Sequence, residues 1–121
     1  MYEIDFYEDQ HSNSELRNFL QTLNQSHRKE DLVLLKKITF QLELLAQVGP
    51  QLREPQAKFL KGYQYPIMEL RPMPERIFYA RWHDNHFILL SHYTKRQNKT
   101  DRREVLRAIR LYEDWIERNG Q

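Results

Sequence analysis

Cysteine is absent from the sequence, and long apolar runs are missing as well. Without cysteine the chain can form neither disulfide bonds nor thiolate metal sites. The longest apolar runs, 32–35 and 87–90, fall far short of the ~18 residues that a membrane span requires. The first forty residues contain no apolar segment of signal-peptide type. We therefore expect a cytoplasmic protein without a membrane segment.

Common catalytic and nucleotide-binding motifs are absent too. The sequence has no P-loop, no G-x-G-x-x-G, G-x-S-x-G or H-E-x-x-H motif, and no carboxylate-rich cage for a metal. His83, Asp84 and His86 are potential metal ligands, but they lie at a predicted turn and are more simply explained as a polar hairpin tip. We therefore expect chemistry that needs no metal and no other cofactor.

What the sequence does contain is the composition of one globular domain. Its 121 residues are 40% hydrophobic, 30% charged and 12% aromatic, a balance that supports a buried core and argues against disorder. This length suits one ordinary domain and is too short for two, so we expect a single domain over residues 1–121.

Positive charge is concentrated in one part of the chain. The net charge is only +2, but residues 71–110 contain ten Lys and Arg against four Asp and Glu, a local charge of +6. The preceding residues have eight against ten and the following ones have one against three, so each flank carries −2. A local excess is expected of a surface that meets phosphates, because Lys and Arg displace condensed counterions. The alternative is a solvated basic face without a partner.

Hydrophobic periodicity predicts a first strand and two helices in the first half of the chain. Residues 2–7 alternate apolar and acidic side chains, as a half-buried strand does. Ser12-x-x-Glu15 is a capping-box pattern that predicts a helix over about 13–25. Apolar side chains at three- and four-residue spacing from Leu35 predict a second helix, stopped by Gly49-Pro50 and antiparallel to the first.

Strands dominate the second half. A short extended piece is expected at 57–60, and three strands are expected to follow it, at 65–71, 76–82 and 86–93. Short links between strands make neighbours antiparallel. A last helix, capped by Thr100, is expected to reach Gly120. The order β-α-α-β-β-β-α predicts the α+β class, with a small antiparallel sheet packed against an N-terminal helical pair and a C-terminal helix.

Two arginines flank one of the predicted links. Arg71 closes one strand and Arg76 opens the next, so an antiparallel hairpin would bring both guanidiniums to the same end of the sheet. Arginine keeps its charge and offers a rigid fork of donors that matches a phosphate. The alternative is that these arginines form salt bridges with Glu69 or Glu75.

The last predicted strand ends in His92-Tyr93-Thr94-Lys95-Arg96, at a kind of position where catalytic groups are often presented. Histidine can transfer protons near neutral pH, and tyrosine can donate a proton or stack on a splayed base. A hydrogen-bonded structural histidine and a core-filling tyrosine are the alternatives. Farther on, Arg103, Arg107 and Arg110 share a helix face, for which a solvated face is the simpler interpretation.

Several short motifs follow one another over roughly residues 55–110. They are Pro55, Lys58, Leu60, Met68-Glu69-Leu70-Arg71, Arg76-Ile77-Phe78-Tyr79, the segment 88–96, and Lys99-Thr100. In this order and spacing they resemble the phage-derived, HigB-like branch of the RelE toxins. Tyr93 departs from the pattern at a position where phenylalanine is usual, and Asp101 at one where proline is common.

The resemblance implies a RelE-like fold and the toxin of a type II toxin–antitoxin system, a ribosome-dependent endoribonuclease that cuts messenger RNA during translation. Without a metal, the RNA's own 2′-hydroxyl would be the nucleophile. The residues then expected to act in catalysis are Arg71, Arg76, His92, Tyr93 and Lys95. Those expected to bind RNA are Lys58, Arg96, Lys99 and Arg103.

The same resemblance implies the partners. They would be the ribosome, messenger RNA and a HigA-like helix-turn-helix antitoxin. The protein would contact DNA only indirectly, through that antitoxin. An acidic antitoxin surface would complement the basic block. Two other functions remain open, because one fold can carry different sites. The protein could be a ParE-like, non-enzymatic inhibitor of DNA gyrase, or an inactive prophage-derived relic that only binds its antitoxin.

Overall fold

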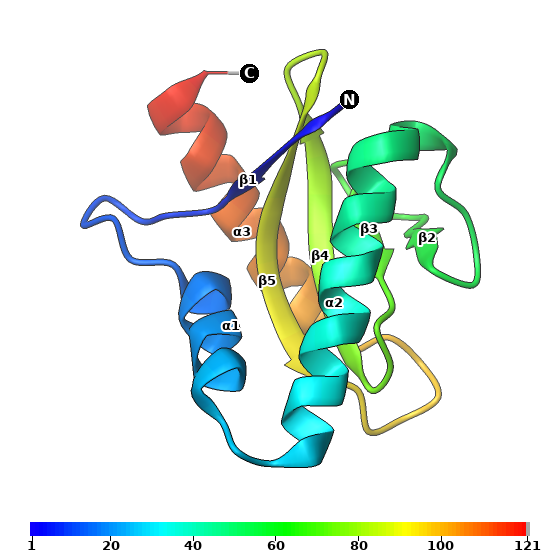
Figure 1. Ribbon diagram of the computed structural model, residues 1–121. Coiled ribbons are helices and arrows are strands. Elements are labelled where there is room, and N and C mark those ends of the chain that lie inside the picture. Colours follow the sequence, from blue (N-terminus) through cyan, green and yellow to red (C-terminus); the bar gives the residue numbers. More distant parts are fainter. Residues whose placement is uncertain (121) are drawn as a thin grey trace.

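The strands form one five-stranded sheet in the order β1-β5-β4-β3-β2, as a computed structural model of residues 1–120 shows (Figure 1). The strands are β1 (Glu3–Phe6), β2 (Ala57–Phe59), β3 (Met68–Leu70), β4 (Glu75–Trp82) and β5 (His86–Thr94). The helices are α1 (Glu15–Gln25), α2 (Lys29–Val48) and α3 (Arg102–Asn119), with a short 3-10 helix, η1 (Gly49–Gln51), after α2. The α+β class and the predicted arrangement are confirmed, and the extended piece expected at 57–60 is the short strand β2.

The sheet is antiparallel except at one edge. The β2–β3, β3–β4 and β4–β5 pairs are antiparallel, as the short links between them predicted, whereas β1 runs parallel to β5. In the sequence, helices α1 and α2 separate β1 from the other strands. No short link therefore constrains the direction of β1. The β4–β5 ladder is the longest, and its register shifts between Phe78 and Tyr79.

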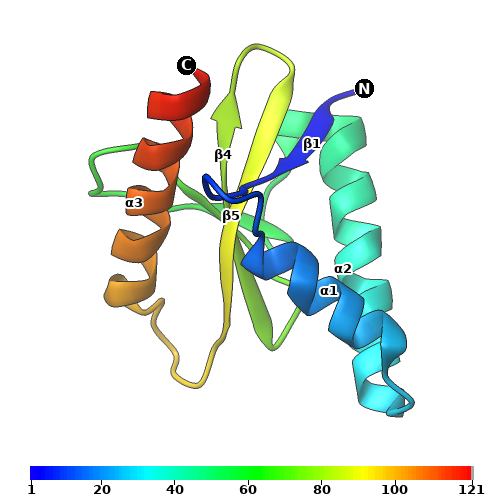
Figure 2. The same cartoon turned by 90° about the vertical axis from the view of Figure 1, so that its left-hand side faces the viewer.

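Helices cover both faces of the sheet (Figure 2). On one face α3 packs against side chains such as Phe78, Ile88 and Leu90, and on the other α1 and α2 pack against Ile77 and Leu89. Because successive side chains of a strand point to opposite faces, each central strand contributes to both cores. Away from the register shift, neighbouring residues of β5 therefore belong to different environments.

Two helix caps differ from the sequence-based expectation. Ser14, rather than Ser12, caps α1, and its hydroxyl accepts a hydrogen bond from the Arg17 N–H at 3.2 Å. Asp101, rather than Thr100, caps α3, and its carboxylate accepts from the Arg103 N–H at 2.9 Å. Neighbouring polar residues are all capable caps, and the backbone path decides which one faces the free N–H groups. The Thr100 hydroxyl is thereby available for another contact.

Both ends of the described chain lie beside the β4–β5 turn (Figure 1). The Trp82 indole N–H donates to the carbonyl oxygen of Gly120 at 2.6 Å, and the Asn85 amide donates to that of Met1 at 3.2 Å. The loop from β5 to α3 lies at the opposite end of the sheet (Figure 1). Within residues 1–120, none of the helices has the length and apolar character that crossing a bilayer demands.

Candidate functional site

Three strands bring cations to the end of the sheet that lies away from the chain ends. Arg71 follows β3, Arg76 is the second residue of β4, and Lys95 follows β5. The Lys95 N–H donates to the carbonyl oxygen of Pro74 at 3.0 Å, which holds the end of β5 against the start of β4. Arg76 pairs with Tyr93, which packs on the core under α3, so these cations gather on the α3 side of the sheet.

A buried carboxylate holds this cluster together. Glu69 in β3 is fully buried, and its Oε1 accepts a hydrogen bond from Arg71 Nε at 3.0 Å and lies 3.6 Å from Arg76 Nε. Its Oε2 accepts from the Thr100 hydroxyl at 3.0 Å. Arg76 is itself only 3% exposed, and a buried guanidinium needs an opposite charge beside it. Glu69 is therefore the counter-ion of the cluster, and the salt bridge proposed as an alternative for both arginines is present.

Next to this cluster lies an open pocket of about 520 Å³. Segments distant in sequence build it: β2 with the residues after it, the end of β3, and the loop from β5 to α3. Its lining residues are Lys58, Phe59, Leu60, Lys61, Tyr63, Arg71, Lys95, Asn98, Lys99 and Thr100. The pocket thus combines five cationic side chains with an apolar, partly aromatic wall.

Lys95 lines three hollows in this region. Besides the main pocket it lines a hollow of about 290 Å³ with Arg76 and Arg96, and another of about 210 Å³ with Tyr93 and Arg96. Its pKa is lowered from the ordinary lysine value, first by burial and then by the positive charge of Arg76, while Glu69 opposes the shift. A lysine with a lowered pKa gives up its proton more readily than a free lysine.

The other predicted RNA-binding cations lie around the same loop. Lys58 and Lys99 line the main pocket, Arg96 lines the two smaller hollows, and Arg103 lines the smaller of those two. The Arg103 side chain is 91% exposed and pairs with Asp101 at 3.3 Å, and this hydrogen-bonded carboxylate raises the pKa of the arginine. Of the four, Arg103 is the one whose charge is already matched locally.

Tyr93 connects the end of β5 to the start of α3. Its ring stacks on Phe78 with centroids 5.7 Å apart, and its hydroxyl oxygen accepts a hydrogen bond from the Asp101 N–H at 3.1 Å. Burial is the main cause that raises the pKa of this phenol. Tyr93 therefore stays protonated at neutral pH, and its hydroxyl anchors the far end of the loop that carries Lys95.

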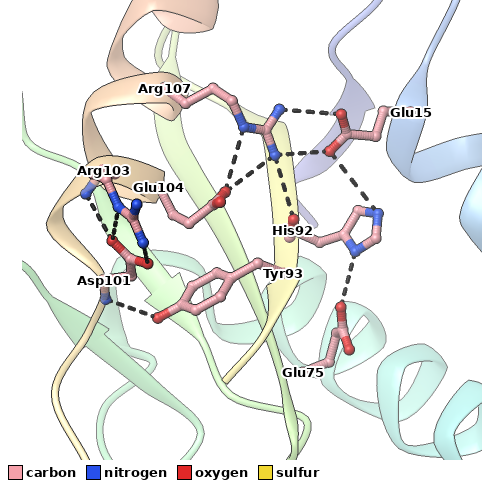
Figure 3. Close-up of polar contacts among 8 residues, drawn as sticks. All are labelled: Glu15, Glu75, His92, Tyr93, Asp101, Arg103, Glu104 and Arg107. Atoms are coloured by element: carbon pink, nitrogen blue, oxygen red, sulfur yellow. Dashed lines mark hydrogen bonds and ion pairs between the residues drawn. The ribbon is translucent and has the colours of Figure 1, made fainter. Parts of the chain in front are cut away.

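His92 is not placed with these residues, because it points to the opposite face of the sheet (Figure 3). Its ring stacks on Phe19 of α1 with centroids 4.2 Å apart, and Nδ1 lies 2.9 Å from Oε1 of Glu75. Arg107 of α3 reaches round the open edge of β5 and pairs with Glu15, whose Oε1 also lies 3.9 Å from His92 Nε2. The structure thus matches the alternative of a hydrogen-bonded structural histidine. The grouping of His92 with Tyr93 and Lys95 was wrong, because His92 and Tyr93 are successive strand residues and face opposite ways.

Several lining residues were missed by sequence reasoning, notably Phe59, Lys61, Tyr63 and Asn98. A signal was present, because residues 58–63 alternate cations with apolar and aromatic side chains in the manner of a single-stranded nucleic-acid site. His83 and His86 lie at the β4–β5 turn as expected, and His86 Nδ1 lies 2.7 Å from Asp5. Among the described residues, no three His, Asp or Glu side chains are grouped to hold a metal ion.

The fold and this site define a small α+β domain with a polycationic pocket at one end of its sheet. The chain belongs to the family described as Phage derived protein Gp49-like (DUF891), which matches residues 18–113 and so includes every pocket residue. This family is related to the RelE-type toxins of toxin–antitoxin systems. The match names the phage-derived family and not a HigB-like branch within it. No curated protein matches the chain.

Proposed function

We propose that this protein is the toxin of a type II toxin–antitoxin pair, of the HigB-like kind, and that it cleaves messenger RNA on the ribosome in the cytoplasm. The observation that carries the proposal is the convergence of five cations from separate segments on one pocket of about 520 Å³. Cationic grooves with aromatic side chains suit single-stranded nucleic acid, because the cations follow the phosphates and the rings stack on bases. Membership of a toxin-related family supports the same function.

The proposed reaction uses only the RNA and side chains of this protein. The 2′-hydroxyl oxygen attacks the adjacent phosphorus, a new P–O2′ bond forms, and the P–O5′ bond breaks. One product then ends in a 2′,3′-cyclic phosphate and the other begins with a 5′-hydroxyl. The proton released by the 2′-hydroxyl is taken up by a base, and another proton is delivered to the departing 5′ oxygen.

Lys95 is the centre of the proposed site because it lines all three hollows. Its lowered pKa suits proton transfer, and Tyr93, protonated and on the same face, suits donation. Arg71 in the main pocket and Arg76 in the hollow of about 290 Å³ would stabilise the negative charge that grows on the phosphorane. Lys58, Arg96 and Lys99 would bind neighbouring phosphates. His92 has no role in this proposal, because it faces α1.

We further propose that an antitoxin with a helix-turn-helix domain, of the HigA-like kind, covers this pocket. The +6 charge of residues 71–110 favours an acidic partner surface. Binding that depends on such charges weakens with salt, so the affinity of the complex is expected to fall steeply between 50 and 500 mM salt, roughly as charge-steered complexes do.

The decisive experiment maps the 5′ ends of messenger RNA after brief expression, and repeats the reaction with purified RNA with and without translating ribosomes. We expect cuts inside translated reading frames, 5′-hydroxyl ends, and no cutting without ribosomes. Lys95→Ala and Arg71→Ala should each slow cleavage by roughly 10²-fold or more, the effect typical of losing one charge-stabilising group. Arg110→Ala is the matched control, because Arg110 is an exposed cation of α3 that lines none of the three hollows.

Other results would favour the other functions. Inhibition of purified DNA gyrase without any RNA cleavage would support the ParE-like function instead. Tight antitoxin binding with neither activity would support an inactive relic. Cleavage that is unchanged in both Lys95→Ala and Arg71→Ala would refute the proposed site even if the protein is a nuclease.

A further inference from the structure

We infer that a second pocket, on the sheet face that α1 and α2 cover, binds one nucleotide, with the base inside the pocket and the phosphate at its rim. The pocket is lined by η1, the segment after η1, and residues of β2, β3 and β4. Its volume of about 620 Å³ lies within the roughly 300–1,000 Å³ that is typical of small-ligand pockets. The inference goes beyond the proposed function, because it does not depend on RNA cleavage.

The apolar wall of this second pocket is a row of side chains across three strands. Phe59 in β2 lies opposite Met68 in β3, and Met68 lies opposite Tyr79 in β4. Directly opposed residues of antiparallel strands project to the same face, and Met68 and Tyr79 both pack in the core under α1 and α2. The Phe59 ring, 52% exposed, therefore extends this row at the edge of the sheet, where it offers an aromatic surface to a base.

Tyr79 brings an unpaired hydroxyl to the second pocket. The residue is only 2% exposed, burial alone raises its pKa, and within residues 1–120 its hydroxyl has no hydrogen-bond partner. That hydroxyl is nevertheless not among the described polar atoms that are both unpaired and shut off from solvent. It therefore stays open to the pocket that Tyr79 lines. Because a buried polar group without a partner is costly, a ligand atom that pairs with this hydroxyl is favoured there.

The rim of the second pocket is positively charged. Glu54 is the one carboxylate among the described lining residues, and it pairs with Arg71 at 3.4 Å. The cations of the lining are Arg53, Lys58 and Lys61. Arg53 donates from one guanidinium nitrogen to a backbone carbonyl oxygen at 2.6 Å and keeps other N–H donors. These charges favour an anionic group on the ligand at the rim.

A nucleotide has the layout that these three features require. Its base has two flat faces for the apolar wall and acceptor atoms at its far edge for the Tyr79 hydroxyl, while its phosphate lies at the other end. Inorganic phosphate would use only the rim, and an uncharged aromatic compound only the interior. Every base carries an acceptor, so we expect weak base preference. Lys58 and Lys61 also line the main pocket, so the nucleotide can be free or part of a bound RNA strand.

The test is a calorimetric titration of the full chain at low salt with adenosine 5′-monophosphate (AMP). Adenosine and ribose 5-phosphate are the two halves of this probe, and each should bind more weakly than AMP. Tyr79→Phe removes only the hydroxyl and should weaken AMP binding roughly 2- to 12-fold, the range for one neutral hydrogen bond. Phe59→Ala should weaken it roughly 5- to 150-fold, the range for one base–aromatic stack.

Two control variants should leave the AMP affinity unchanged. Phe40→Ala removes a phenylalanine of α2 that is 60% exposed and lines neither pocket. Lys99→Ala removes a cation that lines the main pocket and not the second one. Thermal unfolding at neutral pH should show Tyr79→Phe to be at least as stable as the wild type, because its hydroxyl has no partner to lose. Weaker AMP binding by this variant would then reflect the pocket and not the fold.

Several results would overturn the inference. They are the absence of AMP binding at millimolar concentration, equal affinity for AMP and ribose 5-phosphate, and an AMP affinity that is unchanged in either Tyr79→Phe or Phe59→Ala. Loss of AMP binding in Lys99→Ala would overturn it as well, because the nucleotide would then occupy the main pocket.

A short 2′-O-methyl oligoribonucleotide, which lacks the attacking hydroxyl, distinguishes the two sources of the nucleotide. If Tyr79→Phe weakens binding of AMP and of this oligonucleotide, the second pocket takes one nucleotide of an RNA strand. If it weakens binding of AMP alone, the pocket takes free nucleotides. Both results support the site, and neither requires that the protein cut messenger RNA, so a failure of the proposed function would leave this inference intact.

Discussion

Replacing Glu69 by glutamine would remove the one buried negative charge that faces Arg76. Glutamine has nearly the same volume, so the change leaves no cavity, and its carbonyl can still accept a hydrogen bond from Thr100. Arg71 is 19% exposed and has Glu54 at 3.4 Å as a second partner, so it loses little. Arg76, at 3% exposed, is then left with no carboxylate partner among residues 1–120.

The expected loss of stability follows from this difference in burial. Removing one partner of a buried ion pair costs about 3–5 kcal/mol, because the remaining charge is desolvated without compensation. Since the amide preserves the contact with Thr100, we expect Glu69→Gln to lose about 3 kcal/mol. For a chain of 121 residues this corresponds to a fall in Tm of about 12 °C.

Urea unfolding followed by tryptophan fluorescence measures this loss, since Trp82 and Trp115 lie outside the cluster. A double-mutant cycle with Arg76→Met identifies its origin. If the two charges compensate each other, the double variant should be more stable than the sum of the single effects predicts, by about 1.5–3 kcal/mol. A loss below about 1 kcal/mol for Glu69→Gln, or additive single effects, would refute the counter-ion role.

Two further predictions concern other buried positions. Burial raises the pKa of Tyr79 to about 12, whereas the unfolded phenol ionises near 10, so the stability due to this group is complete below pH 10 and is lost between pH 10 and 12. Between pH 10 and 12 the unfolding free energy of Tyr79→Phe should therefore fall by roughly 2–3 kcal/mol less than that of the wild type. Equal falls in both proteins would contradict the raised pKa of Tyr79. Gly49 has φ +57, and an added Cβ there would clash with the Tyr2 ring, so Gly49→Ala should cost about 2 kcal/mol or more in urea unfolding. Gly62→Ala is its control, since Gly62 also has a positive φ but open space around it, and an equal cost in both variants would show that the clash contributes nothing.

The elements of the fold could be predicted because each has a local signal. The 3.6-residue period of the helices, the short links between the later strands and the stop at Gly49 depend only on neighbouring residues. Cap positions were less predictable, since Ser12 and Ser14 are equally good candidates by chemistry. The parallel pairing of β1 was not predictable, because a strand that is followed by two helices can return on either side of the sheet.

The sequence by itself determined the order of the elements and the concentration of cations after residue 70. Only the tertiary structure decided which of those cations share a site. It separated His92 from Tyr93, because successive strand residues face different helices. It joined Lys58 and Tyr63 to Lys95, because β2 and the last loop meet only in the folded sheet. It also buried Glu69 completely beside Arg71 and Arg76, and so decided in favour of a salt bridge that the sequence had offered only as one alternative.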